Sequence, residues 1–141
     1  MSSGPVSLSA VLQVCLVVPD APSAPVEATL TYRLDDPYAV RVAFRTRPAA
    51  EAVEWTFARQ LLTDGVTAPA GTGDVRTWPH QSQGEPVVCL SLASPSGTAL
   101  FEIPVNGLVE FLTRTYARIP TGSESLHVDL DRELAELLGP G

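Results

Sequence analysis

Two histidines and two cysteines are the side chains of this 141-residue sequence that are best suited to metal binding or nucleophilic chemistry. His80 falls in a predicted polar loop and His127 just before a predicted helix, and neither has a second ligand at metal-binding spacing. Cys15 and Cys89 lie in apolar runs of different predicted strands, where free cysteine packs as a small hydrophobic residue. A metal site would need all four to converge, so we predict structural roles and no metal.

The sequence also lacks a convincing phosphate loop or carboxylate pair. Gly71-Thr72-Gly73 is the nearest approach to a phosphate loop, but no third glycine or Lys-Ser pair follows, and it leads into a strand. A tight turn that requires positive φ explains it better. Asp35-Asp36 fits a turn before proline, and Asp129 with Asp131 fits a helix start. No nucleophile elbow occurs. We therefore expect a protein without enzymatic activity and without a cofactor.

The charge balance argues against nucleic acid as a partner. The net charge is −7, and all nine basic residues are arginine. Arginine forms planar, bidentate pairs with carboxylates, whereas lysine acts as a point charge. An acidic chain is repelled by a phosphate backbone. We expect no nucleic-acid binding.

Four of the nine arginines cluster in a short stretch of the chain. Arg33, Arg41 and Arg45 fall on the outward face of a predicted hairpin, and Arg47 follows in the loop. Two interpretations remain open. The strip is either a solvated sheet face with ordinary cross-strand pairs such as Glu54–Arg41, or a docking patch for an acidic segment of another protein.

The two tryptophans receive different predictions. Val53, Trp55 and Phe57 alternate on the inward face of a predicted strand, so Trp55 should be buried. Trp78 ends a predicted strand just before Pro79 and a polar loop. It is either a core residue or an anchor in an interface, where tryptophan is enriched.

The elements that must position these side chains begin with strands. Val11 and Cys15 make the second face of the first strand apolar too, so we expect part of that strand to be covered on both sides. Gly65 suits a left-handed helix cap. Alternating apolar and polar residues predict strands at 6–18, 26–33, 38–45 and 53–57, and a change of period predicts a two-turn helix at 58–65.

The second half continues with strands at 75–78, 86–93 and 98–103, then helices at 105–116 and 130–138. Consecutive hairpins favour antiparallel sheets with helices packed on one side, the α+β class. The length suits a single domain, 1–141. The N-terminus lacks a basic signal region, and no apolar run reaches membrane-spanning length. We expect a cytoplasmic protein without membrane insertion, with free cysteines.

Five stretches, in this order, resemble one known family. They are Asp36–Val40, Val53–Arg59, Gly71–Pro79, Val87–Leu90 and Phe111–Thr115. Their order and spacing are similar to those of the SsgA-like sporulation and cell-division proteins of actinomycetes. The match covers most of the chain and is weakest over the first two dozen residues.

The resemblance implies more than the residues alone. It implies a Whirly-like topology with C-terminal helices, assembly as a homotrimer, and action at the division septum. The implied partners are the tubulin-like division protein FtsZ and an SsgA-like paralogue, and the family supplies no catalytic residues. The Whirly-like topology also raises single-stranded nucleic-acid binding as an alternative function. An apolar first strand and the absence of lysine at strand edges independently favour an oligomer.

Overall fold

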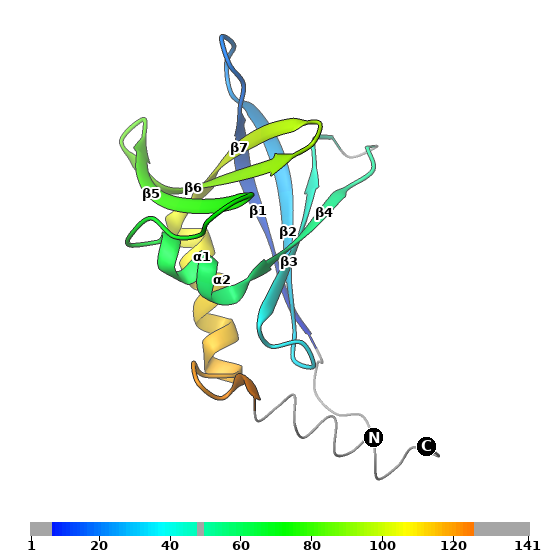
Figure 1. Cartoon of the computed structure of the whole chain (residues 1–141), viewed down its shortest axis with the longest axis vertical. Coiled ribbons are helices and arrows are strands. Elements are labelled where there is room, and N and C mark those ends of the chain that lie inside the picture. Colours follow the sequence, from blue (N-terminus) through cyan, green and yellow to red (C-terminus); the bar gives the residue numbers. More distant parts are fainter. Residues whose placement is uncertain (1–6, 48–49, 126–141) are drawn as a thin grey trace.

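The computed structural model describes residues 7–47 and 50–125, within which the chain forms seven strands and two helices (Figure 1). Most of the predicted elements are present. The last predicted helix, at 130–138, and His127 lie outside the described residues. The elements are β1 Ser7–Val17, β2 Ala24–Arg33, β3 Ala39–Arg45, β4 Val53–Ala58, α1 Arg59–Gly65, β5 Val75–Ser82, β6 Glu85–Ser94, β7 Gly97–Pro104 and α2 Val105–Arg118.

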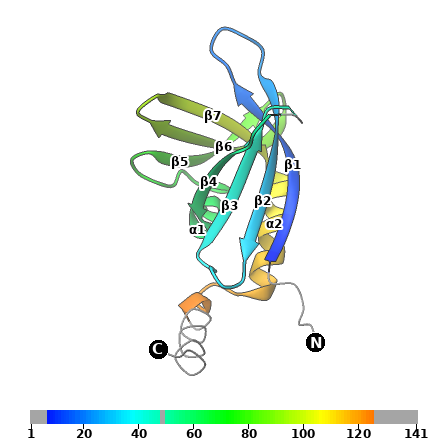
Figure 2. The same ribbon diagram turned by 90° about the vertical axis from the view of Figure 1, so that its right-hand side faces the viewer.

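The seven described strands form one antiparallel sheet in the order β4-β3-β2-β1-β7-β6-β5. β1 pairs with β2 along almost its whole length, from Ser7 to Leu16, but with β7 only from Cys15 to Val17. The two halves of the sheet therefore diverge from the end of β1. Figures 1 and 2 show β5, β6 and β7 turned across one face of β1–β4. The α+β class is confirmed, with one bent sheet where the sequence suggested several.

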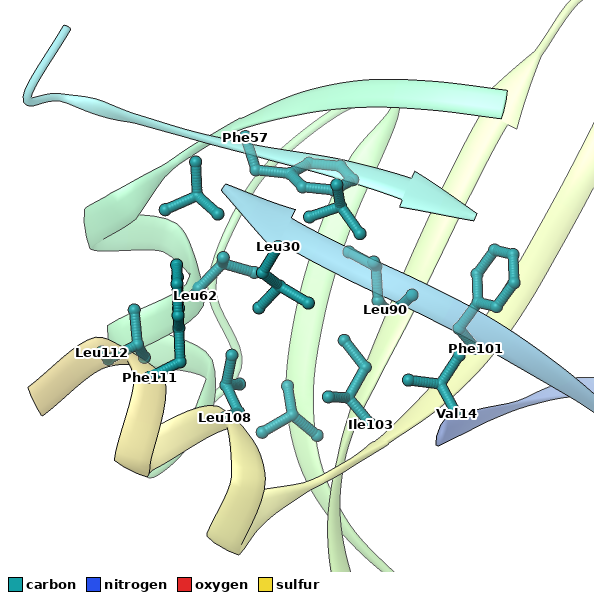
Figure 3. Packing of buried hydrophobic residues seen from close by; sticks show 14 of the residues in the cluster. Val14, Leu30, Phe57, Leu62, Leu90, Phe101, Ile103, Leu108, Phe111 and Leu112 are labelled. Carbon is teal, nitrogen blue, oxygen red and sulfur yellow. The ribbon is translucent and has the colours of Figure 1, made fainter. Parts of the chain in front are cut away.

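The core lies on the inner face of this bent sheet. Both described helices pack there: α1 contacts β4 and β5, and α2 contacts β1, β6 and β7. The alternation of β2 and β3 correctly predicts which of their side chains point inward. Helix and sheet side chains meet in one cluster (Figure 3), which includes Val14, Leu30, Phe57, Leu62, Leu90, Phe101, Ile103, Leu108, Phe111 and Leu112.

α2 is an amphipathic helix that lies against β1. Leu108, Phe111 and Leu112 are buried, as their helical spacing predicts. Gly107 allows the close approach, because a Cβ there would come within 2.7 Å of a methyl group of Leu12. Arg114 donates a hydrogen bond of 3.2 Å to the carbonyl oxygen of Ser9.

Gly65 has a different role from the one predicted. Its φ is not positive, so it is not a left-handed cap. It is buried at the end of α1, where an added Cβ would collide with Oγ1 of Thr77 on β5. Thr77 in turn donates a 3.1 Å hydrogen bond to the carbonyl oxygen of Leu61. A glycine is needed here because helix and strand touch.

The outer face of the sheet departs from the predictions. β1 is not covered on both sides: Val11 is 60% exposed, because both described helices lie on the inner face. Tyr38, the first residue of the strand predicted at 38–45, precedes β3 and is 53% exposed. β5 also continues through Pro79, where the prediction ended it. As an edge strand, β5 tolerates a residue that has no N–H to donate.

Candidate functional site

The first two arginines of the strip, Arg33 and Arg41, lie close to neighbouring aspartates. Arg33 binds Asp35 in bidentate fashion, with N–O distances of 3.0 and 2.8 Å. This hydrogen bonding holds the pKa of the Asp35 carboxyl below its ordinary value. Arg41 lies 3.8 Å from a carboxylate oxygen of Asp36. All four side chains are substantially exposed, so these pairs contribute little to stability.

The second half of the strip has no such counterions. Arg45 and Arg47 form no ion pair with any described residue, and Nε of Arg45 is buried without a hydrogen-bond partner there. Glu27 is the residue opposite Arg45 in the β2–β3 register. A recess of about 200 Å³ opens between them, lined by Gln13, Pro25, Glu27, Arg45, Thr46 and Arg47.

The strip is therefore two separate arginine pairs. Arg41 and Arg45 lie four residues apart on the same face of β3, which separates them by about 13 Å. The predicted pair between Glu54 and Arg41 is wrong, because Arg41 stands opposite Thr56 and lies near Asp36. At the Arg45 end the arginines keep their charge available for a partner.

An apolar groove opens at the same end of β3. It has a volume of about 320 Å³ and lies between the start of β4 and the β6–β7 hairpin. Phe44 and Phe101 stack in it with their ring centroids 4.3 Å apart. Its lining residues are Leu16, Val26, Phe44, Thr46, Val53, Trp55, Leu92, Ser94, Ser96, Gly97, Thr98, Ala99 and Phe101.

Two residues of this groove were assigned to the core by their strand alternation. Val53 is 60% exposed and Trp55 is only half-buried, so the prediction of a buried tryptophan is wrong. Both point to the inner side, but β4 is an edge strand and the sheet opens there. Both residues lie near the start of a strand that follows a loop, and this position is the sequence feature that could have indicated their exposure.

Trp78 lies on a different part of the molecule from the arginine strip. It is half-buried on β5, and β2, β1, β7 and β6 stand between β5 and β3 in the sheet order. It borders a second, wider groove of about 620 Å³ together with Pro69, Gly71, Arg76 and Pro79. The five residues predicted as partner contacts therefore do not form one site.

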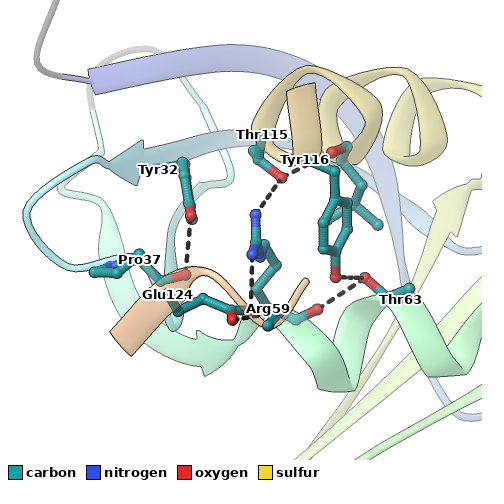
Figure 4. Close-up of polar contacts among 9 residues, drawn as sticks. Tyr32, Pro37, Arg59, Thr63, Thr115, Tyr116 and Glu124 are labelled. Atoms are coloured by element: carbon teal, nitrogen blue, oxygen red, sulfur yellow. Dashed lines mark hydrogen bonds and ion pairs between the residues drawn. The ribbon is translucent and has the colours of Figure 1, made fainter. Parts of the chain in front are cut away.

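A buried arginine cluster was not predicted (Figure 4). Arg59, the first residue of α1, is 1% exposed and donates to Oε2 of Glu124 at 2.8 Å and to Oγ1 of Thr115 at 3.4 Å. Its guanidinium carbon lies 3.9 Å from the ring centroid of Tyr116 and 5.0 Å from that of Tyr32. Arg59 follows the inward-facing Phe57 by two residues. This alternation is the sequence feature that could have predicted the burial of Arg59.

The tyrosines of this cluster are fixed by their hydroxyl groups. Tyr32 donates a 2.9 Å hydrogen bond to the carbonyl oxygen of Pro37, and burial raises its pKa to about 12. Tyr116 and Thr63 share a hydrogen bond of 2.6 Å. The cluster joins β2, α1, α2 and the segment that follows α2, so its role is structural.

The cysteines are free but differ from the prediction in one respect. Cys89 is buried, and burial raises the pKa of its thiol, whereas Cys15 is exposed on the outer face. Both stand opposite Glu102, on the two strands that flank β7. The apolar neighbours of Cys15 do not bury it, because nothing in the described structure covers that face of β1.

The remaining candidates have local roles. Gly71 and Gly73 have φ of +90° and +78°, which confirms the predicted turn. His80 is exposed and lies in β5, not in a loop. Across residues 7–47 and 50–125, no three histidine, cysteine or acidic side chains are grouped to hold a metal ion. No helix of this part is long and apolar enough to cross a membrane.

Within the described residues, the bent antiparallel sheet leaves its outer face uncovered and carries an apolar groove and two arginines without ion pairs, a surface suited to contact with other proteins. Residues 26–124 match the family described as Streptomyces sporulation and cell division protein, SsgA. The chain belongs to this family, which confirms the resemblance seen in its sequence.

Within this family, the chain is similar to SsgB proteins over nearly its full length. It is 55% identical over 135 residues to the sporulation-specific cell division protein SsgB of Frankia casuarinae, which covers 96% of this chain and 94% of that protein. It is 51% identical to SsgB of Streptomyces coelicolor, over 94% of this chain and 96% of that one. It also superposes on the crystal structure of an SsgA-like sporulation-specific cell division protein from Thermobifida fusca. That match has a TM-score of 0.89 and 47% identity, and covers 98% of this chain and 100% of the other.

Proposed function

We propose that this protein acts in sporulation-specific cell division, where it recruits or positions FtsZ at division septa through protein–protein contacts. The observation that carries the proposal is the near-full-length similarity to SsgB proteins of Frankia and Streptomyces, at 55% and 51% identity. Both are named sporulation-specific cell division proteins. An adaptor of this kind needs an accessible binding surface and no catalytic group.

The surface chemistry supports a protein partner. Arg45 and Arg47 offer guanidinium groups without carboxylates bound to them in the described structure, and arginine is enriched in protein interfaces. Trp78, half-buried beside its groove, is of the residue type that most often anchors an interface. Arg33 and Arg41 add charge at the far end of the strip, where Asp35 and Asp36 already offset it.

The proposal includes the setting in which the protein works. We place it in the cytoplasm at the septum, as a single domain over 1–141 that acts without a cofactor, enzymatic activity or membrane insertion. An SsgA-like paralogue is the proposed second partner, and the proposed assembly is a homotrimer.

The test is co-sedimentation with FtsZ polymers assembled with GTP. We expect the purified protein to pellet with the polymers in a saturable manner and to stay in the supernatant when GDP prevents assembly. An unrelated protein of similar acidity is the control for trapping. Recovery in the supernatant at FtsZ concentrations well above the polymerisation threshold would refute FtsZ recruitment.

A further inference from the structure

β4 is an outermost strand of the sheet, and its free edge is open. The amide of Arg59 donates a 2.7 Å hydrogen bond to the carbonyl oxygen of Tyr38, at the end of the β3–β4 ladder. Because hydrogen-bonded pairs alternate along antiparallel strands, Glu54 and Thr56 direct their N–H and C=O groups away from β3. No described backbone group bonds to them there, and both residues are exposed. These groups can pair with an added strand.

The opposite edge of the sheet, on β5, is protected. Ala70 and Thr77 exchange backbone hydrogen bonds of 2.8 and 2.9 Å across it, and Pro79 has no N–H to donate. β4 has no such protection: its sequence contains no proline, lysine or glycine, and it contacts mainly β3 and α1. Of the two outermost strands, β4 is therefore the one that can accept a further strand.

The apolar groove of about 320 Å³ lies beside this edge, on the inner face of the sheet. Val53 and Trp55 line one wall, and the β6–β7 hairpin lines the other. Figure 2 shows β4 on the side of β1–β4 that is turned toward β5, β6 and β7. Side chains that stand opposite each other on neighbouring strands point to the same face. In an added strand, the residues opposite Val53 and Trp55 would therefore point into the groove.

The charge beside the free edge favours a basic strand. Glu54 is exposed on the outward side of β4 and forms no ion pair with any described residue. Arg41 and Arg45 lie on β3, one strand further from the free edge. An added strand would place one outward residue opposite Glu54 at about 5 Å, where opposite charges stabilise the pairing. Arginine or lysine complements this position.

Two other occupants are less suitable. A second copy paired through β4 about a two-fold axis would place the two Glu54 side chains as diagonal neighbours, where their charges repel. Residues 126–141 of the chain carry four acidic side chains and one arginine, and residues 1–6 carry no basic side chain. Neither segment complements the charge of Glu54.

We propose that the free edge of β4 and the adjoining apolar groove bind an extended segment of a partner protein, which adds to the sheet as a further strand. Its backbone pairs with that of Glu54 and Thr56. Alternate side chains of the segment are apolar and enter the groove beside Val53 and Trp55. The side chains between them are basic, and one stands opposite Glu54. This inference rests on the proposed function, because it states the surface and the partner chemistry that the adaptor uses.

The experiment uses the full chain and a fluorescein-labelled peptide of sequence Thr-Val-Arg-Phe-Arg-Val-Thr, with binding followed by fluorescence anisotropy. The arginines and the apolar residues of this peptide occupy opposite faces of an extended strand. We expect saturable binding that weakens as the salt concentration rises. Two control peptides, one with glutamates for the arginines and one with alanines for the valines and phenylalanine, should each bind at least about fivefold more weakly.

Methylation of the peptide backbone separates strand addition from contact through side chains alone. The arginine amides face β4, because the arginines stand opposite Glu54 and Thr56, whereas the valine amides face away. N-methylation of both arginines removes two hydrogen bonds and should weaken binding about tenfold. N-methylation of both valines is the matched control and should weaken it by less than about threefold.

Protein variants then locate the site. Glu54→Arg should weaken binding of the arginine peptide at least about fivefold and strengthen binding of the glutamate peptide. The matched control is Glu110→Arg, at an exposed position of α2, and its effect should stay below about twofold. Val53→Asp should also weaken binding, whereas Val109→Asp, exposed on α2, should not. Circular dichroism checks that each variant is folded.

Three results would overturn the inference: no saturable binding, equal binding of the two N-methylated peptides, or an equal response to Glu54→Arg and Glu110→Arg. A fall in mass by light scattering on Val53→Asp substitution would instead assign the edge to a second copy, and would also overturn it. Failure here with intact FtsZ co-sedimentation leaves the proposed function standing. Peptide binding without co-sedimentation removes FtsZ and keeps the site.

Discussion

Arg59 and Glu124 form a 2.8 Å ion pair between residues 65 positions apart, and their side chains are only 2% and 13% exposed. The pair ties the first residue of α1 to the segment that follows α2 (Figure 4). Glu124 also accepts a 2.8 Å hydrogen bond from the amide of Gly122. The contact therefore fixes the path of the chain as it leaves α2.

Removing the carboxylate should destabilise the protein strongly. Glu124→Ala leaves the guanidinium of Arg59 buried without its counterion, and the expected loss is about 3 kcal/mol of unfolding free energy. Urea denaturation followed by circular dichroism measures it. The control is Glu51→Ala at an exposed position, expected to change stability by less than about 0.5 kcal/mol. A similarly small change for Glu124→Ala would show that the pair does not hold this segment.

The same pair should make stability depend on acidity. Hydrogen bonding from Arg59 holds the pKa of Glu124 below its ordinary 4.5. The folded protein therefore binds this proton less readily than the unfolded chain. The stabilisation is complete above pH 4.5 and is lost as the pH falls through the folded-state pKa. Thermal unfolding from pH 7 to 3 should show the wild type losing its advantage over Glu124→Gln, and parallel curves would contradict this.

The two thiols should react at different rates. Cys15 is exposed and should be modified rapidly by a thiol reagent in the native state, while Cys89 should react only on unfolding. The two strands that carry them flank β7, about 9.6 Å apart, beyond the reach of a disulfide. The check is titration with Ellman's reagent before and after denaturant. Native reactivity of both thiols, or of neither, would contradict the structure.

Nucleic acid should bind weakly or not at all. Counterion release requires several cationic contacts, and on this chain of net charge −7 two of the strip arginines already pair with Asp35 and Asp36. An electrophoretic shift with single-stranded DNA at several salt concentrations tests this. Sub-micromolar binding that weakens with salt would instead favour the nucleic-acid function that the Whirly-like topology raised.

The protein should be an oligomer in solution. The open outer face carries Val11, and before Cys15 no strand pairs with β1 on its β7 side within the described residues. An edge of this kind favours pairing with another copy. Light scattering after size exclusion should give about 45 kDa for a trimer, three times the 15.0 kDa of one chain. A mass near 15.0 kDa at micromolar concentrations would exclude it.

Local periodicity was enough to predict most elements and their buried faces. The alternation in β2 predicts that Val26, Ala28, Leu30 and Tyr32 point inward, and all four are at most 2% exposed. The stripe of α2 is predicted equally well. These predictions succeed because the side-chain direction in a strand or helix follows directly from the position along it.

The grouping of the arginine strip was predicted only in part. The sequence pointed to Arg45 and Arg47 but grouped them with Arg33 and Arg41, because no local pattern shows that the turn aspartates pair with one end of the strip. It also assigned Trp55 to the core. Whether an inward-facing residue is covered depends on which distant strand crosses over it, and here an open groove remains between Trp55 and the β6–β7 hairpin.

The sequence by itself determined the antiparallel elements, the faces of their side chains, the acidic surface and the family. Tertiary structure alone decided that both described helices cover one face of a bent sheet, that Arg59 is buried against Glu124, and that the apolar groove and the basic recess open on opposite faces of the sheet. The physical reason is the sequence separation of the residues in contact. Periodicity fixes directions within an element, whereas burial and charge pairing depend on contacts between residues far apart in the chain.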